Sequence, residues 1–350
     1  MKLNGIRQFS KFLYALLASV VCAGLSSCHA VWQEEPVCDQ GLSIRFIYDY
    51  NMEDANAFMS QVDCLTVFVY KENGEYVTTV TETDRAKLKD ENWRMNINLP
   101  EGRYKVVAYG GMACPESSFD FVGGAPAAGS VFDSRRVRLK PSCLTAPVGT
   151  NLHPLFYGFS RTSSSDSEIL VAEVEYNDPD YVPVTVYMMK DTNNIRILLQ
   201  NLNGDPLTGD DFEFSLTGDN TLMDYDNSLM PAGSVTYRPW VKGQEKAGIL
   251  PDGSEATLAY AELSTGRLVY GNKTTLCVKS VKDGKEVFNI PVINYLLLLK
   301  SQEYTWMGNQ EFLDRESRWN VIFFLDHNNS WVTTHIVVND WVVRIENIEL

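Results

Sequence analysis

The sequence has few positive charges for its length. Its 350 residues include 30 lysines and arginines against 45 aspartates and glutamates, which gives a formal net charge of −15. Proteins that hold nucleic acid by neutralising phosphates need a surplus of basic side chains. We therefore expect no nucleic-acid partner. The ordinary share of apolar residues, 45%, also excludes a wholly disordered or low-complexity chain.

Motifs that carry catalysis are missing as well. The sequence holds four histidines and contains no HExxH, GxSxG, Walker A or GxGxxG pattern. His153 precedes a proline in a predicted loop, and His335 alternates with Trp331 along a predicted strand. Structural roles are expected of both histidines. The sequence therefore predicts a protein that is not an enzyme and has no cofactor.

Acidic clusters are the remaining pattern that could hold a cation. They are Asp210-Asp211 with Glu213, and Asp219 with Asp224 and Asp226. Carboxylate oxygens are the ligands that calcium prefers, but neither cluster has the spacing of an EF-hand loop. A chain this acidic produces such clusters by chance. We expect no metal site.

Cysteines are few and widely spaced. Seven occur, and no two lie within a CxxC spacing, which excludes a zinc knuckle or a thioredoxin-like redox site. Beyond residue 28 the cysteines are Cys38, Cys64, Cys114, Cys143 and Cys277. Because their number is odd, at least one thiol is free or pairs outside the chain. The pairing among the others stays open at this point.

Only the N-terminus carries a long hydrophobic run. Lys2, Arg7 and Lys11 precede an apolar stretch over residues 12–25. This stretch is too short to span a hydrocarbon core of ~30 Å as a stable helix, and it has the layout of an export signal. It ends in Leu25-Ser26-Ser27-Cys28, the Leu-small-small-Cys pattern of a bacterial lipobox.

The lipobox predicts a lipid on Cys28. The cysteine thiol would accept a diacylglycerol, after which the signal is removed and the new amino group is acylated. Several acyl chains, at about 0.8 kcal/mol per buried CH₂, hold a protein on a membrane far more firmly than one. We expect a lipoprotein signal peptide over residues 1–27 and a lipidated tether over 28–37. Removing the basic signal would leave the mature chain still more acidic.

Strand signals dominate the rest of the chain. Residues 65–70 and 76–80 flank Asn73-Gly74, which is a strong hairpin signal. Further hairpins are predicted for 95–99 with 104–108, for 276–282 with 285–290, and for 319–325 with 331–338. Short helices are expected over 54–61 and 292–300. Many short strands separated by turns favour an all-β chain of β-sandwiches.

The length favours two domains. A stretch rich in serine and aspartate over residues 161–180 is the expected linker, although 169–176 could be the last strand of the first domain. We place an N-terminal β-sandwich at 38–178 and a C-terminal β-sandwich at 179–350.

Several segments together resemble a known family. In chain order they are 38–46, 48–52, 62–70, 99–104, 108–112, 155–158 and 190–196, followed by the most specific set, 310–316, 323–326, Trp331 and 339–341. They cover nearly the whole mature chain in order, which a chance motif would not do. The chain resembles the FimB-type fimbrial anchor lipoproteins of type V pili, the fimbrillin-associated anchors of Gram-negative anaerobes.

The resemblance implies two transthyretin-like β-sandwiches with short helices and no enzymatic activity. It also implies a surface-exposed outer-membrane lipoprotein that tethers the base of a fimbrium and limits its length. The partner would be a fimbrial stalk subunit, a fimbrillin, joined through strand addition, in which backbone hydrogen bonds supply the affinity. Donor and acceptor roles both stay open here, as does a tip or adaptor role in the same pilus system.

A second interpretation is a surface lipoprotein that binds glycans or host ligands. Exposed aromatic side chains would carry the binding, and Trp93, Trp240 and Trp306 are the candidates. Trp331 and Trp341, by contrast, are expected to be core residues of the C-terminal sandwich.

Two further segments bear on assembly. Arg135-Arg136 is a dibasic pair, for which we expect a solvated loop rather than a protease site. The apolar positions of residues 342–350 could form a strand junction with a stalk subunit or complete the last strand of the domain.

Replacing Cys28 by serine should release the protein from the outer membrane, because a serine hydroxyl does not accept the lipid. Labelling cells with azido-palmitate and separating the membrane fraction measures both effects. Cys38→Ser is the matched control and should keep label and location. A wild-type protein without label would contradict the prediction.

Overall fold

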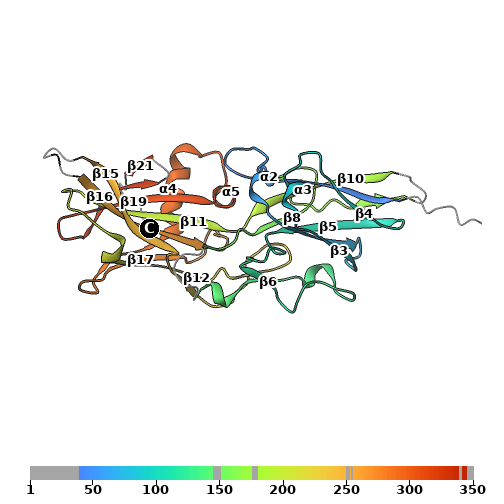
Figure 1. Cartoon of the computed structure of the whole chain (residues 1–350), viewed down its shortest axis with the longest axis horizontal. Coiled ribbons are helices and arrows are strands. Elements are labelled where there is room, and N and C mark those ends of the chain that lie inside the picture. Colours follow the sequence, from blue (N-terminus) through green and yellow to red (C-terminus); the bar gives the residue numbers. More distant parts are fainter. Residues whose placement is uncertain are drawn as a thin grey trace, which may run out of the picture.

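The computed structural model describes residues 39–144, 151–175, 180–249, 253, 255–338 and 341–344, and gives only the backbone for 249, 255, 301–303, 333–336 and 341–344. Strands dominate and the helices are short, so the predicted all-β class is confirmed. Two β-sandwich domains lie end to end along the long axis of the molecule (Figure 1).

The first domain is built on one large sheet. Its strands are β1 (Gly41–Ile47), β2 (Leu65–Lys71), β3 (Tyr76–Glu82), β4 (Met95–Asn98), β5 (Gly102–Gly110), β8 (Phe156–Ser160), β9 (Ala172–Val174) and β10 (Tyr181–Lys190). They follow the order β3-β2-β5-β8-β10-β1-β4, with β9 paired to β5. Two short helices, α2 (Phe58–Gln61) and α3 (Arg85–Leu88), belong to the same domain.

The hairpin at Asn73-Gly74 forms as predicted. Strands β2 and β3 pair antiparallel across it. Gly74 adopts φ +91°, which a side chain would disfavour, so the glycine is needed in this turn.

Alternation along the strands gives this sheet two buried faces. Leu42 and Ile44 of β1 lie in one buried cluster with Val67 and Val69 of β2, so the sheet bends over and encloses its own core. The intervening residues of β2, such as Phe68, point to the opposite face and belong to a second cluster.

A small three-stranded sheet covers that opposite face. It consists of β6 (Phe119–Phe121), β7 (Val137–Leu139) and β13 (Leu222–Met223) in the order β13-β7-β6. Phe121 packs edge-on against Phe68 and Tyr109, with ring centroids 5.3 Å apart in both pairs. Strand β13 comes from the second half of the chain, so the two domains share this layer.

The second domain is a sandwich of a six-stranded and a four-stranded sheet. The first contains β11 (Asn193–Asn201), β15 (Val241–Ile249), β16 (Glu255–Thr265), β19 (Arg318–Leu325), β20 (Trp331–Val338) and β21 (Trp341–Arg344), in the order β15-β16-β11-β19-β20-β21. The second contains β12 (Phe212–Gly218), β14 (Val235–Tyr237), β17 (Thr275–Ser280) and β18 (Glu286–Pro291). Helices α4 (Val292–Glu303) and α5 (Asn309–Arg315) join β18 to β19.

Most local predictions are confirmed. The hairpins β17–β18 and β19–β20 form, and α4 covers the expected helix at 292–300. The helix expected at 54–61 is restricted to α2. The hairpin of 95–99 with 104–108 is wrong: both strands exist, but β4 pairs with β1 and β5 pairs with β2. Met95 and Ile97 gain burial beside β1 that a local hairpin would not give them.

The chain passes between the domains later than expected. The boundary at 178/179 would put β10 in the second domain, but β10 pairs in parallel with β1 and antiparallel with β8. Val184, Val186 and Met188 are buried in the core of the first domain. The crossing therefore lies at Asp191-Thr192, between β10 and β11. Strand β9 shows that part of the expected linker is indeed a strand of the first domain.

One disulfide joins Cys64 to Cys114, with Cα atoms 5.5 Å apart. It ties the residue before β2 to the loop after β5, and closing a loop of 50 residues stabilises the folded state by roughly 4 kcal/mol in the chain-entropy model. Within the part of the chain that the structure describes, Cys143 and Cys277 form no disulfide. Cys38 lies outside the described residues.

A buried polar network holds the crossing. Asp191 is fully buried, and its Oδ1 accepts a hydrogen bond of 2.7 Å from the Nδ2 of Asn227. Next to it, Arg267 forms two hydrogen bonds of 2.8 Å with the carboxylate of Asp314. Burial raises the pKa of Asp191 to about 7, although the positive charge of Arg267 acts in the opposite direction.

Replacing Asp191 by asparagine should change how stability depends on pH. An acid whose pKa is raised in the folded state favours folding while it is protonated, so this contribution is lost as pH rises from about 4 towards and past 7. The free energy of unfolding, measured in urea at pH 5 and pH 8, should fall less with pH in Asp191→Asn than in the wild type. Glu316, whose pKa is also raised by burial, is present in both proteins and cancels in the comparison. Equal pH dependence of the two proteins would contradict the prediction.

Candidate functional site

Several predicted features lie outside the described residues. These are Cys28, the signal and the tether before residue 39, the segment 345–350, and the side chains of His335 and Trp341. Within the described ranges, no helix is both long and apolar enough to cross a membrane.

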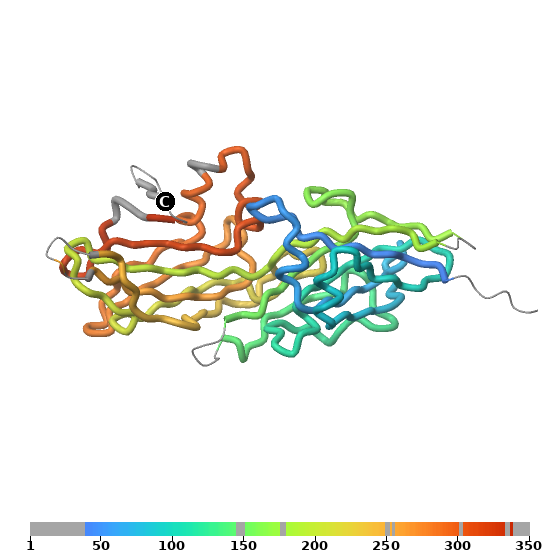
Figure 2. Tube along the Cα trace, turned by 45° about the horizontal axis from the view of Figure 1, so that its top comes forward, coloured from blue at the N-terminus to red at the C-terminus, as the bar shows by residue number. Residues whose placement is uncertain are grey.

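The direction of the strands shows at which end of the long axis the described chain starts and at which end β11 finishes. Strand β10 runs directly into β11, and β1 is parallel to β10, so β1 begins at the end away from the second domain. Figure 2 shows the blue start of the chain at one end and the second domain at the other. The end of β11 therefore marks a distal end, opposite the start of β1.

The edges of the six-stranded sheet differ in character. Strand β15 carries Lys242, Glu245 and Lys246 and has a bulge before Gly248. Charges and bulges on an edge strand block pairing with another chain. Strand β21 at the opposite edge has the apolar sequence WVVR, and pairs on one side with β20. Because β20 starts at the distal end, the antiparallel β21 runs towards that end.

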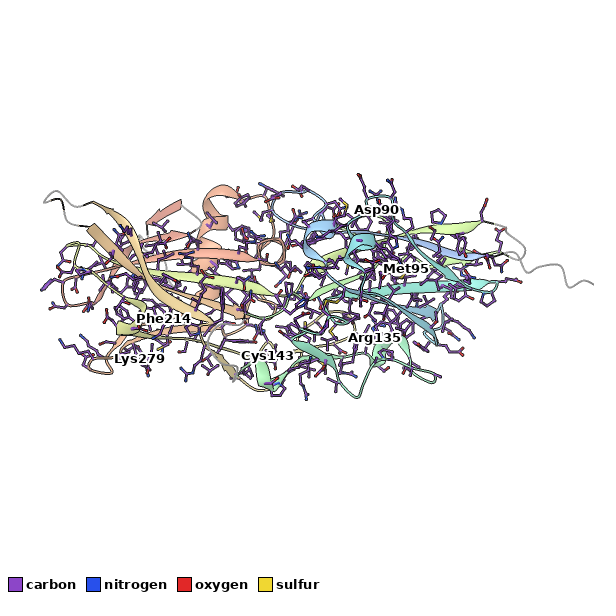
Figure 3. The ribbon with its side chains drawn as sticks, viewed as in Figure 1. Asp90, Met95, Arg135, Cys143, Phe214 and Lys279 are labelled. Atoms are coloured by element: carbon purple, nitrogen blue, oxygen red, sulfur yellow. A yellow bond between two sulfur atoms is a disulfide. The ribbon has the colours of Figure 1, made fainter. Side chains whose placement is uncertain are left out.

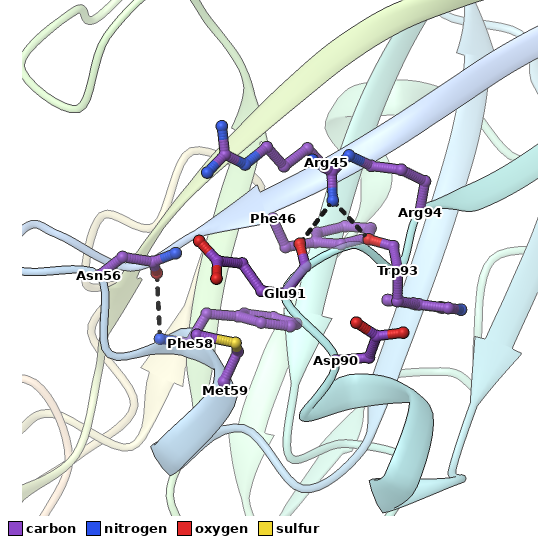
Figure 4. Close-up of a pocket in the computed structure, with 9 residues that line it drawn as sticks. All are labelled: Arg45, Phe46, Asn56, Phe58, Met59, Asp90, Glu91, Trp93 and Arg94. Atoms are coloured by element: carbon purple, nitrogen blue, oxygen red, sulfur yellow. Dashed lines mark hydrogen bonds between the residues drawn. The ribbon is translucent and has the colours of Figure 1, made fainter.

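The side chain of Trp93 packs against other aromatic rings and is not exposed as a platform for a ligand. Its ring stacks on Phe46 at 6.0 Å, and Phe46 stacks on Phe58 at 5.5 Å. Arg94 donates hydrogen bonds to the carbonyls of Glu91 and Trp93, which fixes the loop (Figure 4). The hollow beside these residues has only about 20 Å³, room for about one water molecule. It is too small for a sugar.

The other tryptophans fall into two groups. Trp240 is half-buried, and its indole nitrogen is fully enclosed. Trp331 is partly buried and packs against the stacked rings of Phe288 and Phe323, with ring centroids at 5.4 and 5.5 Å, at the margin of the hydrophobic core. Trp306 is 70% exposed, so it alone of the three candidate platforms presents its ring to solvent.

Local contacts engage five of the six acidic candidates, and the sixth, Glu213, is exposed. Asp210 pairs with Lys242 at 3.2 Å, and Asp211 caps a turn through the amide of Thr208. Asp219 accepts from the amide of Ala232, Asp224 pairs with Arg136, and Asp226 accepts from Ser228. Among the described residues, no three or more His, Cys, Asp or Glu side chains come together as metal ligands.

The dibasic pair is not solvated as expected. Arg135, which is labelled in Figure 3, is 2% exposed. Its guanidinium lies over the rings of Phe132 and Tyr70, at 4.3 and 5.1 Å from their centroids. It donates to the carbonyl of Phe132 and, across the domain junction, to that of Tyr225. Aromatic faces and carbonyls replace water around the guanidinium, so Arg135 joins the two domains. A protease could not reach this bond in the folded protein.

An open groove lies on the second domain that the sequence did not predict. The loop between β16 and β17, the end of β18 and the start of α4 enclose about 600 Å³. The groove is lined by Tyr270, Asn272, Lys273, Asn289 and Asn294, among others. A tyrosine beside a Gly-Asn pair between two strands was the available signal, since this pattern places an aromatic ring on a tight turn.

These features define the class of the protein. It is a two-domain β-sandwich in which five of the six candidate acidic ligands are engaged in local contacts. The chain belongs to the family of fimbrillin-A associated anchor proteins Mfa1 and Mfa2, whose model matches residues 34–347. The resemblance predicted from the sequence motifs is confirmed.

Solved structures agree with this assignment. Two come from Bacteroides thetaiotaomicron: a putative adhesin with 49% identity and TM-score 0.80, and a putative polysaccharide-binding protein with 31% identity and TM-score 0.71. Each alignment covers 87% of this chain and 98% of the other. The fimbrial anchor protein Mfa2 from Porphyromonas gingivalis shares the fold, with 18% identity and TM-score 0.62 over 88% of this chain and 99% of that one. A search of curated proteins found no match.

Family membership makes this chain a fimbria-associated, adhesin-like protein of the cell surface, with a fimbrial subunit as its general class of partner. The family consists of fimbrial anchor proteins, and the related structures are named as an adhesin, a polysaccharide-binding protein and a fimbrial anchor rather than as enzymes.

The tryptophan environments generate a paired stability test. Trp331→Ala removes a ring from the aromatic cluster of the second domain and should lower the free energy of unfolding by about 3 kcal/mol. Trp306→Ala removes an exposed ring and should change it by less than about 0.5 kcal/mol. Thermal and urea unfolding of both variants measures the difference. Equal losses would show that exposure does not distinguish the two sites.

Proposed function

We propose that this protein is the outer-membrane anchor of a fimbrium, lipidated on Cys28, which holds the pilus base at the cell surface and limits its length. The observation that carries the proposal is the family match, which begins at residue 34, a few residues after the lipobox. Lipid and anchor domains would thus be adjacent in one chain. The proposal includes no enzymatic activity.

The shape of the molecule supports an anchoring role. Strand β1 begins at the end away from the second domain, and the tether precedes it. The tether over residues 28–37, even when fully extended, spans at most about 35 Å, at ~3.4 Å per residue. A lipid on Cys28 would therefore keep the first domain near the membrane and direct the second domain outwards, towards a fimbrial subunit.

Strand β21 is the proposed place of contact. It is an edge strand with the apolar sequence WVVR, and it leads towards the distal end. A fimbrillin strand added at this edge, or residues 345–350 donated to the fimbrillin, would be held by backbone hydrogen bonds and alternating apolar side chains. Such a junction tolerates salt, because screening acts mainly on exposed charge pairs.

A tip or adaptor role predicts a different phenotype. A tip subunit needs no membrane lipid, and its loss would leave fimbriae attached to cells. An anchor with its lipid removed would shed whole fimbriae into the medium. The Cys28→Ser variant therefore separates the two roles within the family.

Deleting residues 345–350 should detach fimbriae from cells while the lipid and the melting temperature stay unchanged. Electron microscopy of cells and immunoblots of the medium measure the detachment. Lys246→Ala on β15, at the opposite edge, is the control and should leave fimbriae attached.

Three results would count against this contact. A destabilised domain would show that the segment only completes the fold. Unchanged attachment of fimbriae to cells would show that residues 345–350 have no part in assembly. Dissociation of a purified anchor–fimbrillin complex in 1 M salt would argue against a strand junction.

A further inference from the structure

The groove is formed by the loop between β16 and β17, the end of β18 and the start of α4, and none of its lining residues belongs to β21. Its volume of about 600 Å³ lies within the range of about 300–1,000 Å³ that is typical of small-ligand sites. Tyr270 at its rim is 56% exposed. An exposed ring at the rim of a groove is accessible to a ligand that enters the groove.

The loop that carries Tyr270 is fixed by hydrogen bonds to Gln310 of α5. The amide of Tyr270 donates a hydrogen bond of 2.8 Å to the Oε1 of Gln310, and the Nε2 of Gln310 donates to the carbonyl of Leu268. Leu268 is 1% exposed, and the neighbouring Arg267 is fixed by Asp314. The exposed ring is therefore held on a rigid support. A preorganised site loses little conformational entropy when it binds a ligand.

Three carboxamide side chains line the same groove as Tyr270. Asn272, Asn289 and Asn294 line the groove. Over the described part of the chain, the side-chain amides of Asn272 and Asn294 form no hydrogen bond within the protein. Each amide offers donors and an acceptor side by side, which matches the paired hydroxyl groups of a sugar. The face of the tyrosine ring offers an apolar surface for the C–H groups of the same sugar.

The charges of the residues that line the groove restrict the class of ligand further. The chain has 45 acidic residues, yet none of the residues that line this groove is an aspartate or glutamate. Lys273 supplies a positive charge at the rim and forms no salt bridge among the residues that the structure describes. A neutral or carboxylated ligand is accepted by such a lining, whereas a cationic ligand is not favoured.

We infer that this groove is a glycan-binding subsite, in which Tyr270 stacks on a sugar ring and Asn272 and Asn294 hydrogen-bond its hydroxyl groups. Lys273 favours sugars that carry a carboxylate. The inference is distinct from anchoring, since none of the residues that line the groove belongs to β21 or to the start of the chain.

The test measures binding of the purified mature protein to a printed array of neutral and carboxylated oligosaccharides, followed by calorimetric titration of the best-retained sugar. Tyr270→Ala should weaken binding about tenfold or more, as expected for loss of an aromatic anchor. Tyr270→Phe keeps the ring and should bind within about threefold of the wild type. Lys273→Ala should weaken carboxylated sugars more than neutral ones.

Trp306→Ala is the matched control, because Trp306 is more exposed than Tyr270 but does not line the groove. Its affinity should equal that of the wild type. Absence of any retained oligosaccharide, or equal affinity of Tyr270→Ala and wild type, would overturn the inference. Equal loss in Tyr270→Ala and Trp306→Ala would also overturn it, by showing non-specific adhesion to exposed rings. Fimbrial attachment in the Tyr270→Ala strain should be normal, which keeps this result separate from anchoring.

Discussion

The buried carboxylate at the domain crossing constrains the rest of the structure. Asp191 lies where one strand of the first sandwich becomes the central strand of the second, and water does not reach it. A buried polar group without partners is costly, so its surroundings must supply hydrogen bonds. Asn227 provides one to Oδ1, and the Arg267–Asp314 pair lies alongside, whereas Oδ2 has no hydrogen-bond partner in the described part of the chain. Four segments of the chain, distant in sequence, have to meet in one arrangement for this network to form, and that arrangement fixes how the two sandwiches adjoin.

Contacts around the crossing turn two domains into one body. The hydroxyl of Tyr157 and the guanidinium of Arg135 both donate to the carbonyl of Tyr225, from the first domain to the second. In return, Arg315 of α5 donates to the carbonyl of Asn51. One hydrophobic cluster also extends through both sandwiches. Relative motion of the domains would break all of these contacts together, so the long axis of the molecule is a fixed direction.

The extent to which sequence predicted this structure follows from how local each feature is. The Asn73-Gly74 hairpin was predictable because its turn chemistry lies within a few residues. The pairing of β1 with β10 was not, since its partners are far apart in the chain and only the shared core selects them. Arg135 looks like a surface residue in a dibasic pair, and only the assembled fold brings aromatic rings and a distant carbonyl to it. At the candidate sites, Trp93 and Trp240 are partly covered whereas Trp306 is exposed, because tertiary packing between segments far apart in the chain decides which ring is covered.

The parallel pairing of β1 and β10 has a mechanical consequence. Consider a tensile load between the start of the chain and the distal end. It would pull the first residue of β1 away from the second domain and the last residue of β10 towards the second domain. The two strands are neighbours with seven residue pairs in register, so such a load acts along them in shear. In this geometry the hydrogen bonds of the ladder bear the force simultaneously, whereas a hairpin pulled apart at one end loses them one by one. The fold thus places its resistance to tension at the two strands through which tension would enter and leave the first domain.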